Sequence, residues 1–355
     1  MSNQQPIPIS KTNCDSDAAQ RPAEQFSQLQ AGWPHLYDCI DLTRASEDSM
    51  IFMDGLSARA TDFGSRSRGG RGELYRQAQA DPLVRSQGIL RLFKITCKDR
   101  NLKSLSADHK IVDVLGGDGV LARAISNLVP PMSVPSIVTS DLSEDMVMAA
   151  RGYGLFAIRQ AAQNLLLKDN SMDAVIFAYG THHIPKDERP QVCAEALRVL
   201  KPGGRIVFHD FEVNSPVSEW FSNVVDLYSF TGHPFPHFSK DEIRGLLRDA
   251  GFEDVEVQYM YDPFILYDES EQAVKNRLAE YLLDMYGMIK LVEEHGYERA
   301  TDVVYDLCCK FFRYDYESFG LRESFGAPCV QVREEADRWR IEAPRMALVG
   351  SGVKA

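Results

Sequence analysis

A short apolar run that opens into a glycine-rich turn is the feature that most constrains this chain. The apolar run covers residues 111–115, and the turn after it contains Gly116, Gly117 and Gly119. Asp141 ends a second apolar run downstream. Glycines let the backbone approach a ligand closely, and an acid about 20 residues further on can bind both hydroxyls of a ribose. The pattern predicts a site for a cofactor that contains a nucleoside.

Composition limits the class of protein and of partner. The chain has 355 residues, 44% of them hydrophobic, which is enough for one large α/β domain with an added cap. A net charge of -12 disfavours binding to nucleic acid or to an anionic membrane, so we expect a small-molecule partner. The seven cysteines have no CxxC spacing, and no apolar run reaches the ~18 residues of a membrane helix. These features predict a cytoplasmic protein with reduced thiols and no membrane contact.

From residue 111 onward, predicted strands alternate with predicted helices, which is typical of a parallel sheet with helices on both faces. The predicted strands cover residues 111–115, 136–140, 155–159, 173–178, 205–210, 253–260 and 346–349. The predicted helices cover residues 120–128, a segment capped by Ser143, residues 187–200, and a segment from a capping box at 239–242 to Gly251. A proline and two glycines at 201–204 predict a turn.

Outside this repeating pattern we divide the chain by composition and periodicity. Residues 1–30 are predicted to be a flexible arm, and residues 31–104 a helical cap that contains a solvated basic loop at 63–72. Residues 105–260, together with 343–355, would form the core. Residues 261–342 would be a mainly helical insertion, serving as a lid or a dimer surface, with a hairpin made of residues 329–333 and 338–342.

Two classes of cofactor fit the glycine turn. Residues 117–122 match the G-x-G-x-x-A pattern of nicotinamide and flavin enzymes, which supports an NAD(P)-dependent oxidoreductase as the alternative. However, Asp113 lies four residues before Gly117. A carboxylate there would crowd a dinucleotide pyrophosphate but suits the cationic methionine end of S-adenosylmethionine. Together with the blocks at 181–185 and 197–204, this favours S-adenosylmethionine.

At these motifs the sequence resembles the class I S-adenosylmethionine-dependent methyltransferases, in their small-molecule O- or C-methyltransferase branch, over roughly residues 105–260. The resemblance implies an α/β fold with a doubly wound, mostly parallel, Rossmann-like sheet of seven strands, the last one antiparallel. It also implies roles for residues: Asp113 would position the methionyl amino group and Asp141 would bind the ribose. The full set of cofactor-binding residues that we expect is Asp113, Gly116, Gly117, Gly119, Asp141, Leu142, Met146, Gln160, Gln163, Tyr179 and Tyr75.

The sequence departs from the family pattern at two places. Leu115 replaces the first glycine of the usual Asp-x-Gly-x-Gly-x-Gly turn. The acid that contacts the adenine amino group in many relatives is absent, and Gln160 or Gln163 would supply that contact instead. These departures leave a second alternative, a methyltransferase-like protein without catalysis.

Histidines follow the fourth and fifth predicted strands, where ligands bind in open α/β sheets. His182 and His183 occupy the place of a catalytic histidine in small-molecule O-methyltransferases, although other members keep histidines there for structure only; the alignment favours His182 as general base. Four further residues are candidates for substrate binding: His209, Glu212, His233 and His237. His182, His183, His233 and His237 also form a candidate divalent-metal site, against the simpler interpretation that they are loop histidines.

The sequence therefore predicts methyl transfer from S-adenosylmethionine to a small molecule, at a hydroxyl or at an activated carbon such as an α-keto acid enol. We expect a role in specialised metabolism and a possible homodimer.

Overall fold

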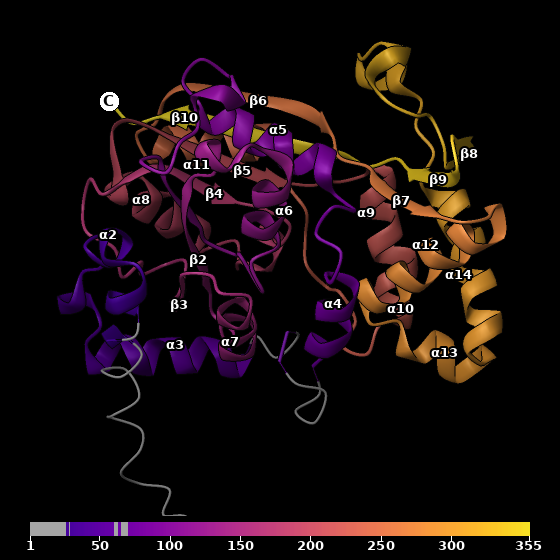
Figure 1. Ribbon diagram of the computed structural model, residues 1–355, viewed down its shortest axis with the longest axis horizontal. Helices are drawn as coiled ribbons and strands as arrows, with labels where there is room; N and C mark the ends of the chain where they lie inside the picture. The colour runs from indigo at the N-terminus through magenta and orange to yellow at the C-terminus, as the bar shows by residue number, and fades with distance from the viewer. Residues whose placement is uncertain (1–25, 28, 60–62, 65–69) are drawn as a thin grey trace, which may run out of the picture.

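A seven-stranded sheet forms the centre of the molecule (Figure 1). The computed structural model describes residues 26–27, 29–59, 63–64 and 70–355. The strand order is β3-β2-β1-β4-β5-β10-β6, and β10 runs antiparallel to β5 and β6. The strands are β1 (Lys110–Asp113), β2 (Ser136–Asp141), β3 (Ala157–Arg159), β4 (Met172–Phe177), β5 (Leu200–Asp210), β6 (Glu253–Tyr261) and β10 (Met346–Val353). The predicted sheet, including its antiparallel last strand, is confirmed.

Helices cover both faces of this sheet because successive side chains of a strand point to opposite faces. Ile111 of β1 packs in one cluster with α5 (Ser86–Thr96) and α6 (Val120–Leu128). Its neighbour Val112 packs in another cluster with α8 (Arg189–Val199) and α11 (Lys240–Asp249). Both side chains are fully buried, which accounts for the continuous apolar runs seen in the sequence.

Local sequence signals set the helix ends where they were predicted. The Ser143 hydroxyl accepts a hydrogen bond from Met146 N at the start of α7 (Glu144–Gly152). The Ser239 hydroxyl accepts one from Glu242 N at the start of α11. Gly251, just after α11, has a φ of +99°, a conformation that glycine adopts without strain. Both predicted N-caps and the predicted C-terminal glycine are confirmed.

The predicted turn at residues 201–204 instead forms the beginning of β5. Gly203 has a positive φ of +78°, as expected for a turn glycine. The pairing of β4 with β5 shifts register between Met172 and Ala174, so the strand accommodates the tight segment as an irregularity. Sheet pairing therefore overrides the local turn signal.

The segment before the sheet is helical, as predicted. It contains α2 (Pro34–Tyr37), a 3-10 turn at Leu42–Arg44, α3 (Glu47–Arg59) and α4 (Gly72–Ala78). The predicted flexible arm lies outside the described residues over positions 1–25 and 28, and the predicted basic loop does so over positions 65–69.

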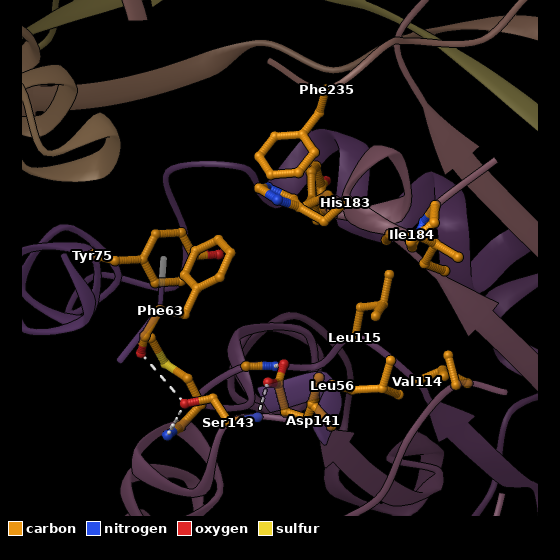
Figure 2. A pocket seen from close by; sticks show the side chains of 18 of the residues that line it. Leu56, Phe63, Tyr75, Val114, Leu115, Asp141, Ser143, His183, Ile184 and Phe235 are labelled. Atoms are coloured by element: carbon orange, nitrogen blue, oxygen red, sulfur yellow. Dashed lines mark hydrogen bonds between the residues drawn. The ribbon is translucent and has the colours of Figure 1, made fainter. Parts of the chain in front are cut away.

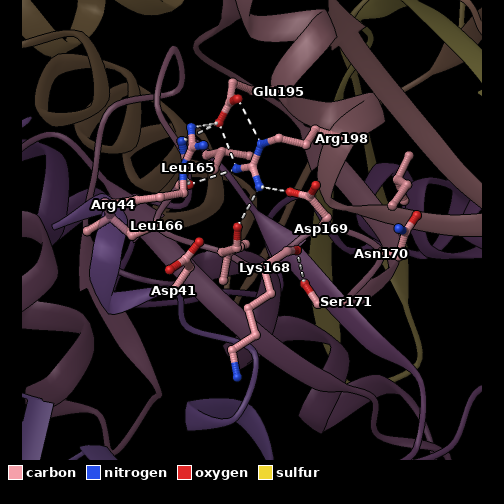
Figure 3. Close-up of polar contacts among 12 residues, drawn as sticks. Asp41, Arg44, Leu165, Leu166, Lys168, Asp169, Asn170, Ser171, Glu195 and Arg198 are labelled. Carbon is pink, nitrogen blue, oxygen red and sulfur yellow. Dashed lines mark hydrogen bonds and ion pairs between the residues drawn. The ribbon is translucent and has the colours of Figure 1, made fainter.

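A charged network ties this N-terminal segment to the loop between β3 and β4 (Figure 3). Glu195 of α8 accepts hydrogen bonds from Arg44 Nη2 at 2.9 Å and from Arg198 Nη2 at 2.8 Å. The same carboxylate accepts from Leu165 N at 2.8 Å, and Arg44 Nε donates to Leu165 O. The nearly buried carboxylate of Glu195 is paired with both arginines. Because this carboxylate also accepts from the backbone at Leu165, the network fixes the loop that follows β3.

Residues 261–342, which we call the insertion, form a second, smaller body beside the sheet (Figure 1). Its three-stranded sheet has the order β7-β9-β8. The strands are β7 (Phe264–Asp268), β8 (Gln331–Glu335) and β9 (Arg338–Ala343), and the helices are α12 (Glu271–Tyr286), α13 (Ile289–His295) and α14 (Tyr297–Phe311). The hairpin of β8 and β9 is confirmed, whereas β7 was not predicted.

Two short helices between β5 and α11 pack against the insertion. These are α9 (Pro216–Trp220) and α10 (Asp226–Tyr228), separated by a π-helical turn at Phe221–Val225. Trp220 is fully buried in the core of the insertion and packs on Phe312. Among the helices of the described residues, none has both the length and the apolar character to cross a membrane.

Candidate active site

A cavity of about 420 Å³ opens at the carboxyl ends of the central strands (Figure 2). It lies where the strand order reverses, between β1 with β2 on one side and β4 on the other, which is the usual ligand position in such sheets. We call it the large cavity. Asp141 and Ser143 lie at one end of it, and His183 and Phe235 lie at the other (Figure 2).

The glycine turn reaches the large cavity at Leu115 and Gly117, which line it. Gly117 has a φ of +54° and Gly119, the N-cap of α6, a φ of +84°. A Cβ at Gly116 would lie 2.8 Å from Thr139 Cγ2 and 2.9 Å from Asp113 Oδ2. The turn therefore needs glycine at 116 for space and at 117 and 119 for conformation.

Asp113 is a buried carboxylate without a donor. Its side chain is 1% exposed, and neither oxygen has a hydrogen-bond partner within the described part of the chain. Burial, followed by repulsion from Asp141, raises the pKa of Asp113 to about 8. An unpaired buried acid of this kind is stabilised by a cationic ligand, so the residue fits the positively charged methionyl end of S-adenosylmethionine.

Asp141 has partners on both oxygens. Oδ2 accepts from Gly117 N at 3.0 Å and Oδ1 accepts from Ser143 N at 2.8 Å. Burial raises the pKa of Asp141 to about 6, although these hydrogen bonds oppose the rise. The hydrogen bonds hold the carboxylate at the cavity wall, in the position where a ribose-binding acid was predicted.

The two candidate adenine contacts differ in what they can offer. Gln160 accepts from Leu166 N at 2.7 Å, and its buried Nε2 has no partner among the residues described. Gln163 Nε2 already donates to Glu188. Both line the large cavity, as do Leu142 and Met146, but Gln160 keeps both N–H groups of Nε2 for a ligand, whereas Gln163 uses one.

A buried histidine cluster lies behind His183. The imidazole of His182, in the 3-10 turn Thr181–His183, places Nδ1 3.0 Å from both oxygens of Asp210. His237 Nδ1 lies 3.3 Å from the same carboxylate. His182 Nε2 lies 3.2 Å from His233 Nε2.

Burial and charge define the protonation of this cluster. Burial lowers the pKa of His182 despite the nearby Asp210, lowers that of His233 to about 2, and lowers that of His183 well below its ordinary value. Burial alone would raise the pKa of Asp210, but His182 and His237 outweigh it and hold that pKa well below the ordinary value. His182, His183 and His233 are thus neutral and Asp210 is ionised at neutral pH.

The tautomers follow from these charges. Because an ionised carboxylate only accepts hydrogen bonds, His182 carries its proton on Nδ1 and offers a lone pair on Nε2. His233 then donates from Nε2, and its buried Nδ1 is an acceptor without a partner in the described chain. Asp210, His182 and His233 form a chain along which a proton can move.

A second cavity of about 30 Å³, the small cavity, lies beside this chain. Its wall contains His182 and His233, and Tyr179 and His183 line both cavities. Tyr179 has a φ of +64°, an uncommon conformation for a residue with a side chain, and its hydroxyl donates to Asp262. Tyr75 and Phe63 also line both cavities.

Three of the candidate catalytic and substrate-binding residues lie outside both cavities. His209 is fully buried, with Nε2 3.6 Å from Asp262, and it accepts from Tyr179 N. Glu212 accepts from the Tyr259 hydroxyl at 2.6 Å, and His237 is held by Asp210. Each is engaged by protein groups behind the cavity walls, so of the predicted substrate contacts only His233 borders a cavity.

Several residues of the site were not predicted from the sequence. Leu56 and Phe63, from the N-terminal segment, line the large cavity. Arg71, which belongs to the basic loop predicted to be solvated, is 5% exposed, and its guanidinium lies 4.6 Å from the Phe63 ring centre. Asp262 lies at the start of the insertion, and Arg345 follows its end. A charged residue amid glycines at position 71 was the only local signal.

The geometry of fold and site agrees with a family match. A model described as a methyltransferase domain matches residues 111–204, from β1 to the start of β5. With the strand order and the glycine turn, this match shows that the chain contains a class I S-adenosylmethionine-dependent methyltransferase domain of the small-molecule type. S-adenosylmethionine rather than a nicotinamide is therefore the cofactor that the turn serves.

Similar proteins include two that are named as enzymes of ubiquinone and menaquinone biosynthesis. The chain is 32% identical over 157 residues to the ubiquinone/menaquinone biosynthesis C-methyltransferase UbiE of Hahella chejuensis, and the match covers 42% of this chain and 60% of that enzyme. The chain is 29% identical over 203 residues to UbiE of Stutzerimonas stutzeri, and this match covers 49% of this chain and 76% of that enzyme. Phosphoethanolamine N-methyltransferase 2 of Haemonchus contortus, solved with S-adenosylmethionine, is 17% identical with a TM-score of 0.41, covering 79% of this chain and 60% of that one.

Proposed function

We propose that this protein transfers a methyl group from S-adenosylmethionine to a small-molecule acceptor, at an activated carbon such as an α-keto acid enol or at a hydroxyl. The observation that carries the proposal is the chain Asp210–His182–His233 beside the wall that the two cavities share. Such a chain can remove a proton from an acceptor, which methyl transfer to carbon or to a hydroxyl requires.

The large cavity would hold the cofactor. Asp113 would pair with the methionyl amino group, Asp141 would bind the ribose hydroxyls, and Gln160 would donate to the adenine. When bound, S-adenosylmethionine supplies an electrophilic methyl group on a sulfonium, whose C–S bond electrons stay on sulfur as the bond from methyl to the acceptor forms. The residues of the protein orient the acceptor for this in-line displacement.

The acceptor proton would leave along the histidine chain. His233 Nδ1 takes it, His233 Nε2 passes its own proton to His182 Nε2, and Asp210 stabilises the imidazolium that results. His183, which lines both cavities, would position the acceptor. His182 is thus the base that finally holds the proton.

The same histidines fit a divalent metal. Ligand atoms of His182, His183 and His233 lie within 4.8 Å of one another, as do those of His182, Asp210 and His237. Two imidazoles about 2.1 Å from a tetrahedral zinc ion would be separated by roughly 3.4 Å, and the His182–His233 separation is 3.2 Å. A carboxylate behind a ligating histidine is also a common arrangement, here Asp210. His182, His183 and His233 would hold such an ion, which would polarise an acceptor carbonyl.

Binding and activity measurements test the function. Calorimetry should detect S-adenosylhomocysteine binding, and absence of binding would exclude the proposed function.

With a methylated acceptor detected by mass spectrometry, His182→Ala should lower kcat by about 10²- to 10⁴-fold without changing S-adenosylhomocysteine affinity. His295→Ala, at an exposed position in α13, is the matched control. Full activity of His182→Ala would exclude His182 as the general base. Activity that survives exhaustive chelation would exclude a required metal ion.

Further parts of the proposal concern the whole chain. We propose the division into an N-terminal cap (31–104), a core (105–260 with 343–355) and the insertion (261–342) as a lid, since Met285 and Tyr286 of α12 line the small cavity. A homodimer, a cytoplasmic location and a role in specialised metabolism are proposed with it. Sedimentation, cell fractionation and product analysis would test these three.

A further inference from the structure

The backbone of Tyr179 is held in a strained conformation at the wall between the two cavities. Its φ is +64°, and the residue follows β4 and lines both cavities. A residue with a side chain keeps such a conformation only where the surrounding contacts hold it there. Gly180 and the turn Thr181–His183 come directly after it. The position of Tyr179 therefore also affects the positions of His182 and His183.

Three contacts hold Tyr179, and they come from three parts of the chain. Its backbone N donates to His209 Nδ1 at 3.4 Å, from β5 of the main sheet. The guanidinium of Arg85, just before α5, lies 4.0 Å from its ring centre. Its hydroxyl donates to Asp262 Oδ1 at 3.1 Å. Asp262 belongs to the insertion, so one of the groups that fix this wall comes from outside the main sheet.

Asp262 is itself fixed at the base of the insertion, where the chain leaves the main sheet after β6 and returns to it before β10. Its carboxylate is fully buried, and Oδ2 accepts from Arg345 Nη2 at 2.6 Å. The two backbones are also joined, since Asp262 N donates to Arg345 O at 2.9 Å and Arg345 Nε donates to Asp262 O at 3.0 Å. These three bonds leave Oδ1 free to accept from Tyr179.

The charges around Asp262 strengthen its bond to Tyr179. Burial alone would raise the pKa of Asp262, but Arg345, followed by His209 and Arg85, outweighs burial and lowers it. His209 Nε2 lies 3.6 Å from Oδ2. The carboxylate is thus ionised at neutral pH, and a hydrogen bond to an ionised acceptor is stronger than one to a neutral acceptor.

A glycine in α5 makes room for this hydrogen bond. A Cβ at Gly88 would lie 1.7 Å from Asp262 Oδ1 and 3.1 Å from the Tyr179 hydroxyl oxygen. Any larger residue at this position would displace one or both of the bonded groups. The sequence of α5 is therefore compatible with the contact only because residue 88 has no side chain.

We propose that Asp262 is a positioning residue of the active site, which fixes the wall between cofactor and acceptor through the hydroxyl of Tyr179. This inference rests on the proposed methyl transfer. Without the bond, Tyr179 relaxes towards an ordinary φ, and a smaller fraction of the protein has a wall that fits the cofactor. The apparent affinity for the cofactor falls by the same factor. The insertion thereby contributes to the cofactor site from its base, in addition to the proposed lid.

Calorimetry with S-adenosylhomocysteine tests the inference through a single hydroxyl. Tyr179→Phe keeps the ring beside Arg85 and removes only the bond to Asp262. Its affinity for S-adenosylhomocysteine should fall by about tenfold, on the scale of one hydrogen bond. Denaturant unfolding of the same variant separates this effect from a change in stability, because a less stable protein that is still folded keeps its affinity.

Tyr281→Phe is the matched control. The Tyr281 hydroxyl is also buried, but it has no hydrogen-bond partner within the described residues, and Tyr281 lines neither cavity. The affinity of this variant for S-adenosylhomocysteine should equal that of the wild type.

A double-mutant cycle tests whether Tyr179 and Asp262 act through one contact. Asp262→Ala should weaken S-adenosylhomocysteine binding at least as much as Tyr179→Phe, and the double variant should bind no more weakly than Asp262→Ala alone. If Asp262→Ala does not fold, as melting would show, Gly88→Ala replaces it. The added methyl displaces the carboxylate, so it should weaken binding in the wild-type background and have no further effect on Tyr179→Phe.

Three results would overturn the inference: Tyr179→Phe binds S-adenosylhomocysteine as the wild type does, Tyr281→Phe weakens binding equally, or the effects add in the double variant. If the wild type itself does not bind S-adenosylhomocysteine, the proposed function is refuted and the inference with it.

Discussion

The central residue of the cofactor site is an acid that the protein leaves unpaired. Asp113 sits in β1, fully buried, next to Gly116, with no hydrogen-bond donor among the residues described. In the free protein the native state favours its protonated form, since its pKa is about 8. A cationic ligand reverses this preference, so binding of the cofactor and ionisation of Asp113 are linked.

Asp113→Asn should therefore change both affinity and proton release. At pH 7, binding of S-adenosylhomocysteine to the wild type should release close to one proton, because its ammonium stabilises the ionised acid. The variant should release none and bind about 10- to 100-fold more weakly, the value of one charge-assisted hydrogen bond. Calorimetry in two buffers with different ionisation enthalpies measures both quantities. Equal proton release by the two proteins would contradict the linkage.

The same residue predicts how the stability of the free protein depends on pH. The unfolded chain titrates Asp113 near pH 3.9, and the folded chain near pH 8. The stabilising contribution of the protonated acid is therefore complete below about pH 4 and is lost as pH rises through 8. The stability advantage of Asp113→Asn over the wild type should be larger at pH 9 than at pH 5 by a few kcal/mol, on the order-of-magnitude scale of that shift. Denaturant unfolding at both pH values checks the sign.

At the residue scale, site residues within one sequence motif were predicted, whereas contacts between residues of distant motifs were not. Asp113 and Asp141 were found because each ends a strand beside the glycine turn. The partnership of His182 with Asp210 was not predicted, because it depends on β4 and β5 lying side by side.

At the element scale, helix ends were predicted well and one strand was missed. The caps at Ser143 and Ser239 depend only on neighbours three residues away, so the local sequence contains them. Strand β7 has only five residues, and its partner β9 lies on the far side of three helices in the chain. Such non-local pairing has no signal in a short window.

Helix α5 packs against the turn after β6 through a glycine. A Cβ at Gly88 would lie 1.7 Å from Asp262 Oδ1, so Gly88→Ala must displace the carboxylate that pairs with Arg345. We expect a loss of about 1–3 kcal/mol in the free energy of unfolding, as for other overpacked sites. Denaturant unfolding measures it.

Gly245→Ala in α11 is the matched control, because no heavy atom lies within 4 Å of the added Cβ. This change should be neutral or stabilise the protein by about 0.5–1 kcal/mol. Equal effects of the two substitutions would show that Asp262 is free to move, and the close packing of α5 would then have no energetic consequence.

At the scale of the whole molecule, the small cavity lies where three parts of the chain meet. Arg71 and Arg85 come from the N-terminal segment, His182 from the main sheet, and Met285 from the insertion. Figure 1 shows α4 between the main sheet and α12. The sequence predicted a core with an N-terminal cap and an insertion, but no periodicity specifies that the cap and the insertion contact each other.

This junction predicts that ligands stabilise α4 and the end of α12 together. Arg71, at the start of α4, donates to the carbonyl of Met285, and both residues line the small cavity. With S-adenosylhomocysteine at about 100 times its Kd, amide exchange in both segments should slow by up to about 100-fold. Hydrogen–deuterium exchange followed by mass spectrometry measures this, and α14, which lines neither cavity, is the internal control. In Arg71→Lys, α4 should remain protected while the end of α12 is not. Protection of α4 alone in the wild type would mean that the insertion does not close over the ligand.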